Sequence, residues 1–195
     1  MKNNIIKLNK FEQLELNQGL LSIIYWFFAY PEVKISLTDL SKELNISKKT
    51  ASRVVNNLVK EGFLELEQIG KAWRIHCNLE HRHNRTIKIG YNLGLIYNSG
   101  IIEEIYRIIG NPKAIILFGS YRKGDDIGSS DLDIAVEVIG DKELEIRNIG
   151  TILQLGFRKN VPVNIHIFTR NKIDLNLFAN MANGIVLDGF LEVRP

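Results

Sequence analysis

The strongest apolar run of the chain extends from Leu20 to Tyr30 and is followed by Pro31. Proline disfavours helical geometry in the residue before it, so a helix formed by this run should end near Tyr30. The run is shorter than the roughly 20 apolar residues that span a membrane, and no small-residue cleavage site follows it, as a signal peptide would require. The pattern therefore predicts a helix buried in a protein core.

Two segments after this run also repeat apolar residues at helical spacing. In the segment 36–44, one helical face is made of Leu37, Leu40 and Leu44. The hydroxyl of Thr38 is the expected N-cap of this helix, because it can accept a free N–H of the first turn. The segment 47–60 also has an apolar face, and it is followed by Gly62, a residue that tolerates positive φ. Both segments are therefore predicted to be helices.

Two strand-like runs follow, over residues 63–67 and 72–77, and residues 68–71 between them are predicted to close a β-hairpin. Three helices followed by a hairpin resemble the winged helix-turn-helix domains of transcriptional regulators. The sequence from Leu40 to Phe63 carries this resemblance. We therefore expect an N-terminal winged helix-turn-helix domain.

The resemblance implies that the last of the three helices enters the major groove of double-stranded DNA. Its polar and basic face suits base edges, while basic groups at its flanks and on the hairpin suit phosphates. The candidate DNA-binding residues are Lys48, Lys49, Ser52, Arg53, Asn56, Lys71 and Arg74. The alternative is a basic face that is only solvated, in a module that binds protein or forms a dimer.

Residues 79–110 are predicted to be helical, with an apolar stripe of isoleucines between Ile101 and Ile109 that suits a core or dimer contact. Four side chains of a type that can bind metal lie at the start of this region: His76, Cys77, His81 and His83. Their spacing does not match the common structural zinc patterns. We therefore interpret them as polar residues at a domain junction.

A motif that suggests chemistry lies in the second half of the chain. An apolar run leads into Gly119 and Ser120, and after ten intervening residues Asp131 and Asp133 enter another apolar strand. Glycine lets the backbone approach a phosphate, and the serine hydroxyl can donate to a phosphate oxygen. Because strand positions i and i+2 point the same way, the two aspartates form a carboxylate pair that suits Mg²⁺. The candidate nucleotide-binding residues, two of them able to neutralise phosphate charge, are Gly119, Ser120, Arg122 and Lys123.

Gly-Ser followed after ten residues by Asp-x-Asp resembles the signature of the minimal nucleotidyltransferases of the polymerase-beta-like superfamily, a group that includes antitoxins of toxin–antitoxin pairs. The resemblance spans approximately residues 101–195. It implies a mixed β-sheet flanked by helices, bound Mg²⁺ and a nucleoside triphosphate, with ATP as the expected one. The activity that it implies is transfer of a nucleotidyl group, AMP, to a hydroxyl of a protein or small molecule.

The family places a third aspartate on a later strand, whereas the strand-like run 161–168 of this chain has Asn164 at that position. An amide oxygen can coordinate a metal, but it brings no charge and cannot act as a base, a loss that can cost about 10²–10⁴ in rate. His166 shares the face of Asn164 and either replaces the base or is a partly buried residue without a role. The candidate catalytic residues are Asp131, Asp133, Asn164 and His166, with the two aspartates as metal ligands.

Charge and cysteine content indicate which partners and which cellular compartment to expect. Residues 1–90 hold 14 Lys and Arg against 9 Asp and Glu, a net charge of +5, and residues 91–195 hold 11 against 13, a net charge of −2. Halves of opposite charge suggest different partners. The single Cys77 excludes an internal disulfide and fits a reducing environment, so we expect a cytoplasmic protein.

We therefore expect an α+β chain with a winged helix-turn-helix domain over residues 1–80, a helical connector over 81–110 and a nucleotidyltransferase-like domain over 111–195. Two functions remain open. The first is a DNA-binding, Mg²⁺-dependent nucleotidyltransferase. The second is a transcriptional regulator with a catalytically impaired domain that senses a nucleotide or a partner protein. The expected partners are double-stranded DNA, a nucleoside triphosphate and a second copy of the chain in a homodimer, and no membrane.

Overall fold

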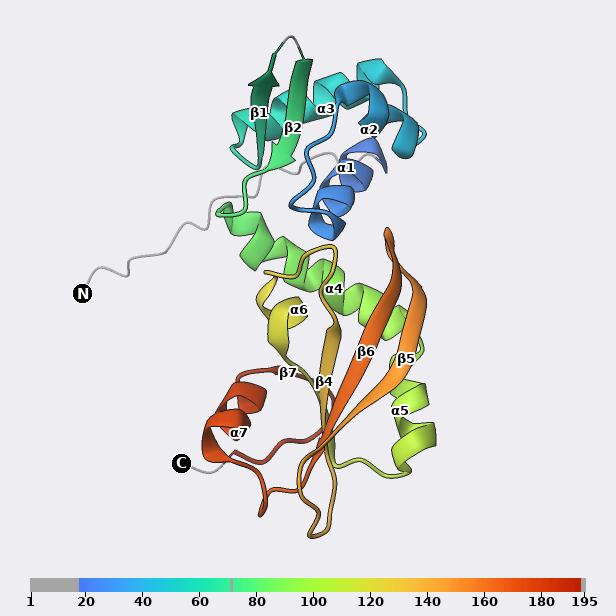
Figure 1. Ribbon diagram of the computed structural model, residues 1–195, viewed down its shortest axis with the longest axis vertical. Coiled ribbons are helices and arrows are strands. Elements are labelled where there is room, and N and C mark those ends of the chain that lie inside the picture. The colour runs from blue at the N-terminus through green and yellow to red at the C-terminus, as the bar shows by residue number, and fades with distance from the viewer. Residues whose placement is uncertain (1–17, 71, 194–195) are drawn as a thin grey trace, which may run out of the picture.

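The computed structural model describes residues 18–70 and 72–193, which form an upper part of helices with a β-hairpin and a lower part built on a β-sheet (Figure 1). The upper part consists of α1 (Gln18–Ala29), α2 (Leu37–Glu43), α3 (Lys48–Lys60), β1 (Leu64–Ile69) and β2 (Ala72–Cys77). Strands β1 and β2 pair antiparallel. This arrangement confirms the predicted winged helix-turn-helix fold. The candidate DNA-binding residue Lys71 lies outside the described residues.

Helix α1 supplies much of the core of the upper part. Its residues Ile23, Phe27 and Phe28 have no exposed surface, and they pack in one cluster with the apolar face of α3 and the start of the hairpin. Removing such large apolar side chains from water is the main favourable contribution to folding. The helix ends at Ala29, two residues before Pro31, as the apolar run predicted.

A serine is the N-cap of each of the two helices of the helix-turn-helix, α2 and α3. The Oγ of Ser36 accepts the backbone N–H of Asp39 at 3.1 Å, and the Oγ of Ser47 accepts that of Thr50 at 3.0 Å. The prediction of Thr38 as the N-cap of α2 was wrong, because the helix already begins at Leu37 and Ser36 is the residue with extended geometry. The carboxylate of Asp39 in turn accepts the Ser36 hydroxyl at 2.6 Å, which strengthens the cap.

The lower part is a mixed five-stranded sheet flanked by helices, as predicted. The strands are β3 (Ala114–Leu117), β4 (Leu132–Glu137), β5 (Glu145–Leu155), β6 (Arg158–Phe168) and β7 (Ile185–Gly189), in the order β5-β6-β4-β3-β7. The central strands β4 and β6 are parallel, and the other neighbours are antiparallel. The pairing of β4 with β6 sets Asp133 opposite Asn164.

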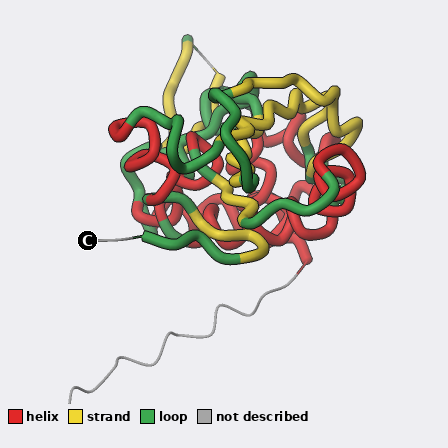
Figure 2. The backbone as a smooth tube through the Cα atoms, turned by 90° about the horizontal axis from the view of Figure 1, so that it is seen from below, coloured by secondary structure: helices red, strands yellow, loops and turns green. Residues whose placement is uncertain are grey.

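Helices cover both faces of this sheet, as the view from below shows (Figure 2). The predicted helical region forms the short 3₁₀ helix η1 (Arg82–Arg85), α4 (Ile87–Asn98) and α5 (Ile101–Ile109). Buried residues of α4 and α5 pack on one face in a cluster that includes Ile96, Ile101 and Ile105. On the other face, Met181 of α7 (Leu175–Ala182) packs near Ala135 and Phe168. The short helix α6 (Gly119–Lys123) follows β3.

Strand β5 was not predicted from the sequence. It lies at the edge of the sheet, and most of its residues are exposed. The residues of β5 that pack on the core, Ile149, Ile152 and Leu155, are three positions apart, so they do not show the alternation of apolar and polar residues that marks a strand. Its pairing with β6 shifts register between Asn148 and Gly150, which marks a β-bulge.

The two parts of the molecule meet where α4 and the tip of the β5–β6 hairpin reach α1 (Figure 1). The rings of Tyr25 and Tyr91 stack with centroids 4.3 Å apart. The hydroxyl of Tyr30 donates to the carbonyl oxygen of Phe157, at the hairpin tip, over 2.6 Å. Burial at this contact raises the pKa of Tyr91 to about 12, so its hydroxyl stays protonated at neutral pH.

His81, His83 and Cys77 make packing contacts at the junction, and Nε2 of His76 lies 3.8 Å from the carboxylate of Glu65. The rings of His81 and His83 both lie against Phe63, and Cys77 contacts the buried side chain of Asn84. Burial raises the pKa of the Cys77 thiol to about 11, which keeps it in the protonated form. Over residues 18–70 and 72–193, no three His, Cys, Asp or Glu side chains are grouped closely enough to hold a metal ion. Over the same residues, no helix is both long and apolar enough to cross a membrane.

Candidate functional site

The Gly-Ser turn and strand β4 meet in one site. Gly119 has φ +71°, a geometry that favours glycine, and it begins α6 directly after the β3 strand and Phe118. A Cβ built on Gly119 would lie 3.0 Å from Oδ2 of Asp133, so a side chain there would crowd the carboxylate. Because Gly119 has no side chain, the turn can lie close to Asp133.

The four candidate catalytic residues lie on the same face of the sheet. Asp131 is exposed and directly precedes β4, whereas Asp133 lies within β4 and is half-buried. On β6, the Nδ2 of Asn164 donates to Oδ2 of Asp131 at 3.1 Å, and Nε2 of His166 lies 3.4 Å from Oδ1 of Asp133. Each aspartate therefore has its own partner on the neighbouring strand.

A chain of amide hydrogen bonds fixes the orientation of Asn164. The backbone N–H of Gly150, at the β5 bulge, donates to Oδ1 of Asn148 at 3.0 Å. The Nδ2 of Asn148 then donates to Oδ1 of Asn164 at 3.0 Å. Because a backbone N–H can only donate, this chain directs the NH₂ group of Asn164, and not its oxygen, towards Asp131. Asn164 thus holds the carboxylate of Asp131 by donating to it.

Sequence reasoning did not identify Asn148 as part of the site. An available signal was Gly150, since an isolated glycine within a strand often marks a bulge. That signal becomes useful only once residues 145–155 are known to form a strand. The partner of Asn148 lies 16 positions away in the sequence, so the hydrogen bond depends on the β5–β6 pairing.

His166 is held by an aromatic contact as well as by Asp133. Its ring meets Phe118 edge to face, with centroids 4.9 Å apart. Its Nδ1 is buried and has no hydrogen-bond partner among the described residues. The side chain is 14% exposed, so Nε2 is directed at Asp133 from a largely enclosed position.

The other candidate nucleotide-binding residues lie on α6. Ser120 and Arg122 are half-buried, and Lys123 is exposed. The Nε of Arg122 is buried without a hydrogen-bond partner within the described part of the chain. A buried donor without a partner is costly, so a bound anion that accepts from it would be stabilised.

The donor set of this site suits Mg²⁺. Mg²⁺ usually takes one or two protein carboxylates and completes its shell with phosphate oxygens and water. Asp131 and Asp133 supply two carboxylates, and the glycine turn lies close to the second of them. In this arrangement the oxygen of Asn164 faces Asn148 and its NH₂ group faces Asp131.

The candidate DNA-binding residues of α3 form its exposed face. Lys48, Lys49, Arg53 and Asn56 are exposed and Ser52 is half-buried, while the opposite face is buried. Arg74 of β2 is half-buried, and its guanidinium lies 3.9 Å from Asp39 of α2. Asp39 therefore offsets part of the charge that Arg74 would offer to a phosphate.

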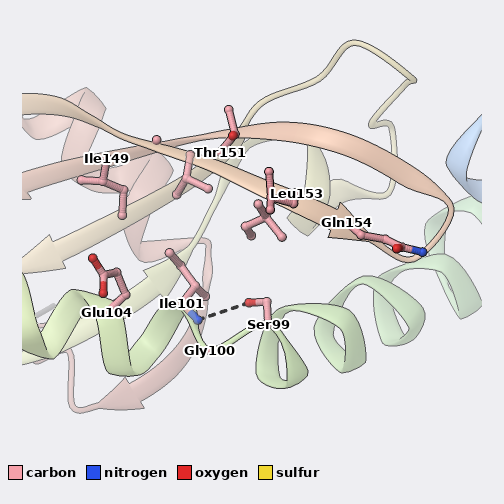
Figure 3. Close-up of a pocket in the computed structure, with 11 residues that line it drawn as sticks. Ser99, Gly100, Ile101, Glu104, Ile149, Thr151, Leu153 and Gln154 are labelled. Carbon is pink, nitrogen blue, oxygen red and sulfur yellow. Dashed lines mark hydrogen bonds between the residues drawn. The ribbon is translucent and has the colours of Figure 1, made fainter.

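A separate groove of about 470 Å³ lies between the α4–α5 turn and the edge strand β5 (Figure 3). The turn is closed by the Ser99 hydroxyl, which accepts the backbone N–H of Ile101 at 3.3 Å. Ile149 and Leu153 line the groove from β5. Gly150 lines it, but Asp131, Asp133, Asn164 and His166 do not, so this groove is distinct from the carboxylates.

The upper part has a winged helix-turn-helix fold with a basic helix. The lower part has a Gly-Ser turn and an Asp-x-Asp pair on a mixed sheet. These features define a class of protein made of two parts, each with its own kind of site. The comparison with known families gives one match in each part. The family model described as Winged helix-turn-helix DNA-binding matches residues 32–65, and the model described as Nucleotidyltransferase domain matches residues 99–187.

The chain therefore combines a winged helix-turn-helix DNA-binding module with a nucleotidyltransferase domain. No curated protein is similar enough to the chain to count as a relative. The nucleotidyltransferase match begins before α5, and the domain limits at residues 80 and 110 remain predictions.

Proposed function

We propose that this protein is a DNA-binding regulator whose nucleotidyltransferase domain binds a Mg²⁺–nucleoside triphosphate, with ATP as the first candidate, and that the bound nucleotide changes its affinity for DNA. The observation that carries this proposal is the amide chain from Gly150 through Asn148 to Asn164. It supports binding over turnover, since the position of a third carboxylate is taken by a hydrogen-bond donor.

In this proposal each group of side chains has one task. Asp131 and Asp133 hold Mg²⁺, while the turn at Gly119 and Ser120 approaches the phosphates. Arg122 and Lys123 offset phosphate charge from α6. Bound Mg²⁺ would supply positive charge that neutralises the triphosphate. A homodimer that places two α3 helices on two half-sites belongs to the same proposal, and sedimentation with and without DNA measures it.

The contact between Tyr30 and Phe157 supports communication between the two parts. It joins α1, which packs on the DNA-binding helix α3, to the hairpin whose strands carry Asn148 and Asn164. An affinity change of about 5- to 150-fold is typical of coupled sites. A contact shared by both parts is a physical route for such coupling.

We expect saturating Mg²⁺–ATP to change the affinity of the wild type for its DNA at least about fivefold, a coupling of ordinary size. Tyr30→Phe should reduce this change, because it removes a hydrogen bond worth about 1 kcal/mol at the contact. Fluorescence anisotropy with a duplex enriched from random sequence by the wild type measures both effects. Tyr106→Phe is the matched control, since its hydroxyl bonds to Asp188 in the lower part. Unchanged wild-type DNA affinity at saturating Mg²⁺–ATP would contradict the regulator proposal.

Nucleotidyl transfer is the second candidate function. Two observations favour it: the Gly-Ser turn lies against Asp133, and His166 directs Nε2 at the same carboxylate. Both observations support a site that holds a triphosphate, while Asn164 leaves the activation of an acceptor hydroxyl without a charged base.

The substitution Asn164→Asp tests how far Asn164 limits Mg²⁺ binding and nucleotidyl transfer at the site. We expect it to raise the affinity for Mg²⁺ in the presence of ATP about tenfold, because a carboxylate can join the ligand set where an amide donor stood. Isothermal titration measures the affinity, and incubation with α-labelled ATP and cell extract measures transfer. Asn164→Ala is the control that removes the donor without adding charge. Label transferred by the wild type as fast as by Asn164→Asp would favour the enzyme over the regulator.

A further inference from the structure

Arg158, the first residue of β6, is a buried cation with two acceptors. Its exposed fraction is 5%, although a buried charge is costly unless it is paired or hydrogen-bonded. Its Nη2 donates to the carbonyl oxygen of Ser130 at 2.5 Å, and its Nη1 donates to the hydroxyl of Tyr121. The guanidinium also lies over the Tyr121 ring, with Cζ 5.3 Å from the centroid.

Both partners of Arg158 are sequence neighbours of the candidate site. Ser130 directly precedes Asp131, and Tyr121 directly follows Ser120 on α6. One planar guanidinium therefore joins the segment that carries a metal-binding carboxylate to the segment that carries the Gly-Ser turn. Arginine presents its donors in a rigid fork, so the bonds to both partners fix the distance between the two segments.

The loop between α6 and β4 is held at several other points behind Asp131. The carboxylate and carbonyl of Asp126 accept from Asn92 at 2.8 Å and from Lys88 at 2.5 Å. The backbone N–H of Ile127 donates to the Ser130 hydroxyl at 2.9 Å. Asn92 and Lys88 both belong to α4, so that helix fixes the start of the loop and Arg158 fixes its end.

Asp131 itself is exposed, so its position depends on these supports. Asn164 donates to the carboxylate of Asp131, and Arg158 donates to the carbonyl oxygen of the residue before it, Ser130. Partners of metal ligands commonly change metal affinity about 10- to 100-fold when they are removed. Through its hydrogen bond to the backbone carbonyl of Ser130, Arg158 is such a partner of Asp131.

We propose that Arg158 is a positioning residue of the Mg²⁺–nucleotide site, which sets Asp131 relative to the Gly-Ser turn by holding Ser130 and Tyr121 without touching the nucleotide. This inference rests on the proposed nucleotide binding. It assigns Arg158 an effect on the metal-dependent part of that binding, beyond its contribution to stability.

The test compares Arg158→Met and Arg158→Lys with Arg170→Met in the full chain. Arg170 is the control, because its guanidinium also lies over an aromatic ring, that of Phe178, and it pairs with Glu137 at the far end of β4 from the site. Titration of Mn²⁺ followed by electron paramagnetic resonance, with and without ATP, reports the metal site. Thermal unfolding reports stability for each variant.

We expect Arg158→Met to weaken ATP-dependent Mn²⁺ binding about tenfold or more, in line with other partners of metal ligands. Arg170→Met should lower the melting temperature and leave Mn²⁺ binding at the wild-type level. Arg158→Lys keeps the charge but cannot serve both acceptors through a planar fork, so it should fold and still bind Mn²⁺ more weakly than the wild type. It therefore decides the question if Arg158→Met does not fold.

Wild-type Mn²⁺ affinity in a folded Arg158→Met or Arg158→Lys protein would overturn the inference and leave the nucleotide site standing. Equal weakening by Arg170→Met would also overturn it, because loss of stability would then explain the effect. A wild type without ATP-dependent Mn²⁺ binding would instead overturn the proposed function, and the inference with it.

Discussion

Asp131→Asn combined with Asp133→Asn is expected to reduce Mg²⁺-dependent ATP binding by more than about 100-fold, since even outer partners of metal ligands are worth about 10- to 100-fold. Both changes keep the size of the side chains and remove the two charges that suit Mg²⁺. Titration of the protein with ATP, at fixed Mg²⁺ and again with the metal chelated, measures the effect. DNA binding in the absence of nucleotide should stay at the wild-type level.

A control for this double variant needs the same change of charge away from the site. Asp141→Asn with Glu143→Gln provides it, because both side chains are largely exposed and pair with Lys172 in the lower part. We expect this control to bind Mg²⁺–ATP as the wild type does. If the site variant retained Mg²⁺-dependent affinity for ATP, the metal site would have been placed on the wrong residues.

Lys49→Ala with Arg53→Ala is expected to lower the affinity for duplex DNA about 100-fold, because each contact to a base or phosphate is worth about 1–3 kcal/mol. Both side chains are exposed on α3, opposite its buried face. Each phosphate contact contributes about 0.9 to the slope of log affinity against log salt concentration, so this slope should fall by up to about 2. Anisotropy titrations over a series of salt concentrations give both values.

Arg107→Ala with Lys172→Ala is the matched control for α3. It removes two positive charges from the lower part, where Arg107 pairs with Glu104 and Lys172 with acidic residues. We expect it to change DNA affinity little, since exposed charges farther away than about 8–10 Å are largely screened at physiological salt. Equal losses in the two double variants would mean that overall charge, and not the face of α3, governs DNA binding.

Much of the fold could be predicted because its elements have local signatures. The run from Leu20 to Tyr30 gave a buried helix, and the repeats that follow gave the helix-turn-helix and the hairpin. The alternation at Val163, Asn164 and Ile165 gave the two faces of β6. The N-cap of α2 was misplaced, because Ser36 and Thr38 are both capping residues and only the backbone geometry distinguishes them.

The candidate site was predicted in part. The Gly-Ser turn and the aspartate pair were recognisable because their spacing in the sequence is short. Asn148 and Arg158 were not, since neither residue belongs to a motif. Asn148 lies on an exposed edge strand, and Arg158 is a basic residue at the start of a strand, where an exposed position is the usual expectation.

The sequence by itself determined the winged helix-turn-helix and the motif residues proposed for the carboxylate site, because periodicity and short motifs report on local geometry. The tertiary structure decided how those residues are used. Strand pairing orients Asn164 towards Asp131, 33 positions away, and hairpin packing brings Arg158 to Ser130, 28 positions away. Such hydrogen bonds depend on which strands become neighbours. The strand pairing is determined by the burial of apolar side chains over the whole sheet, which no local sequence pattern reports.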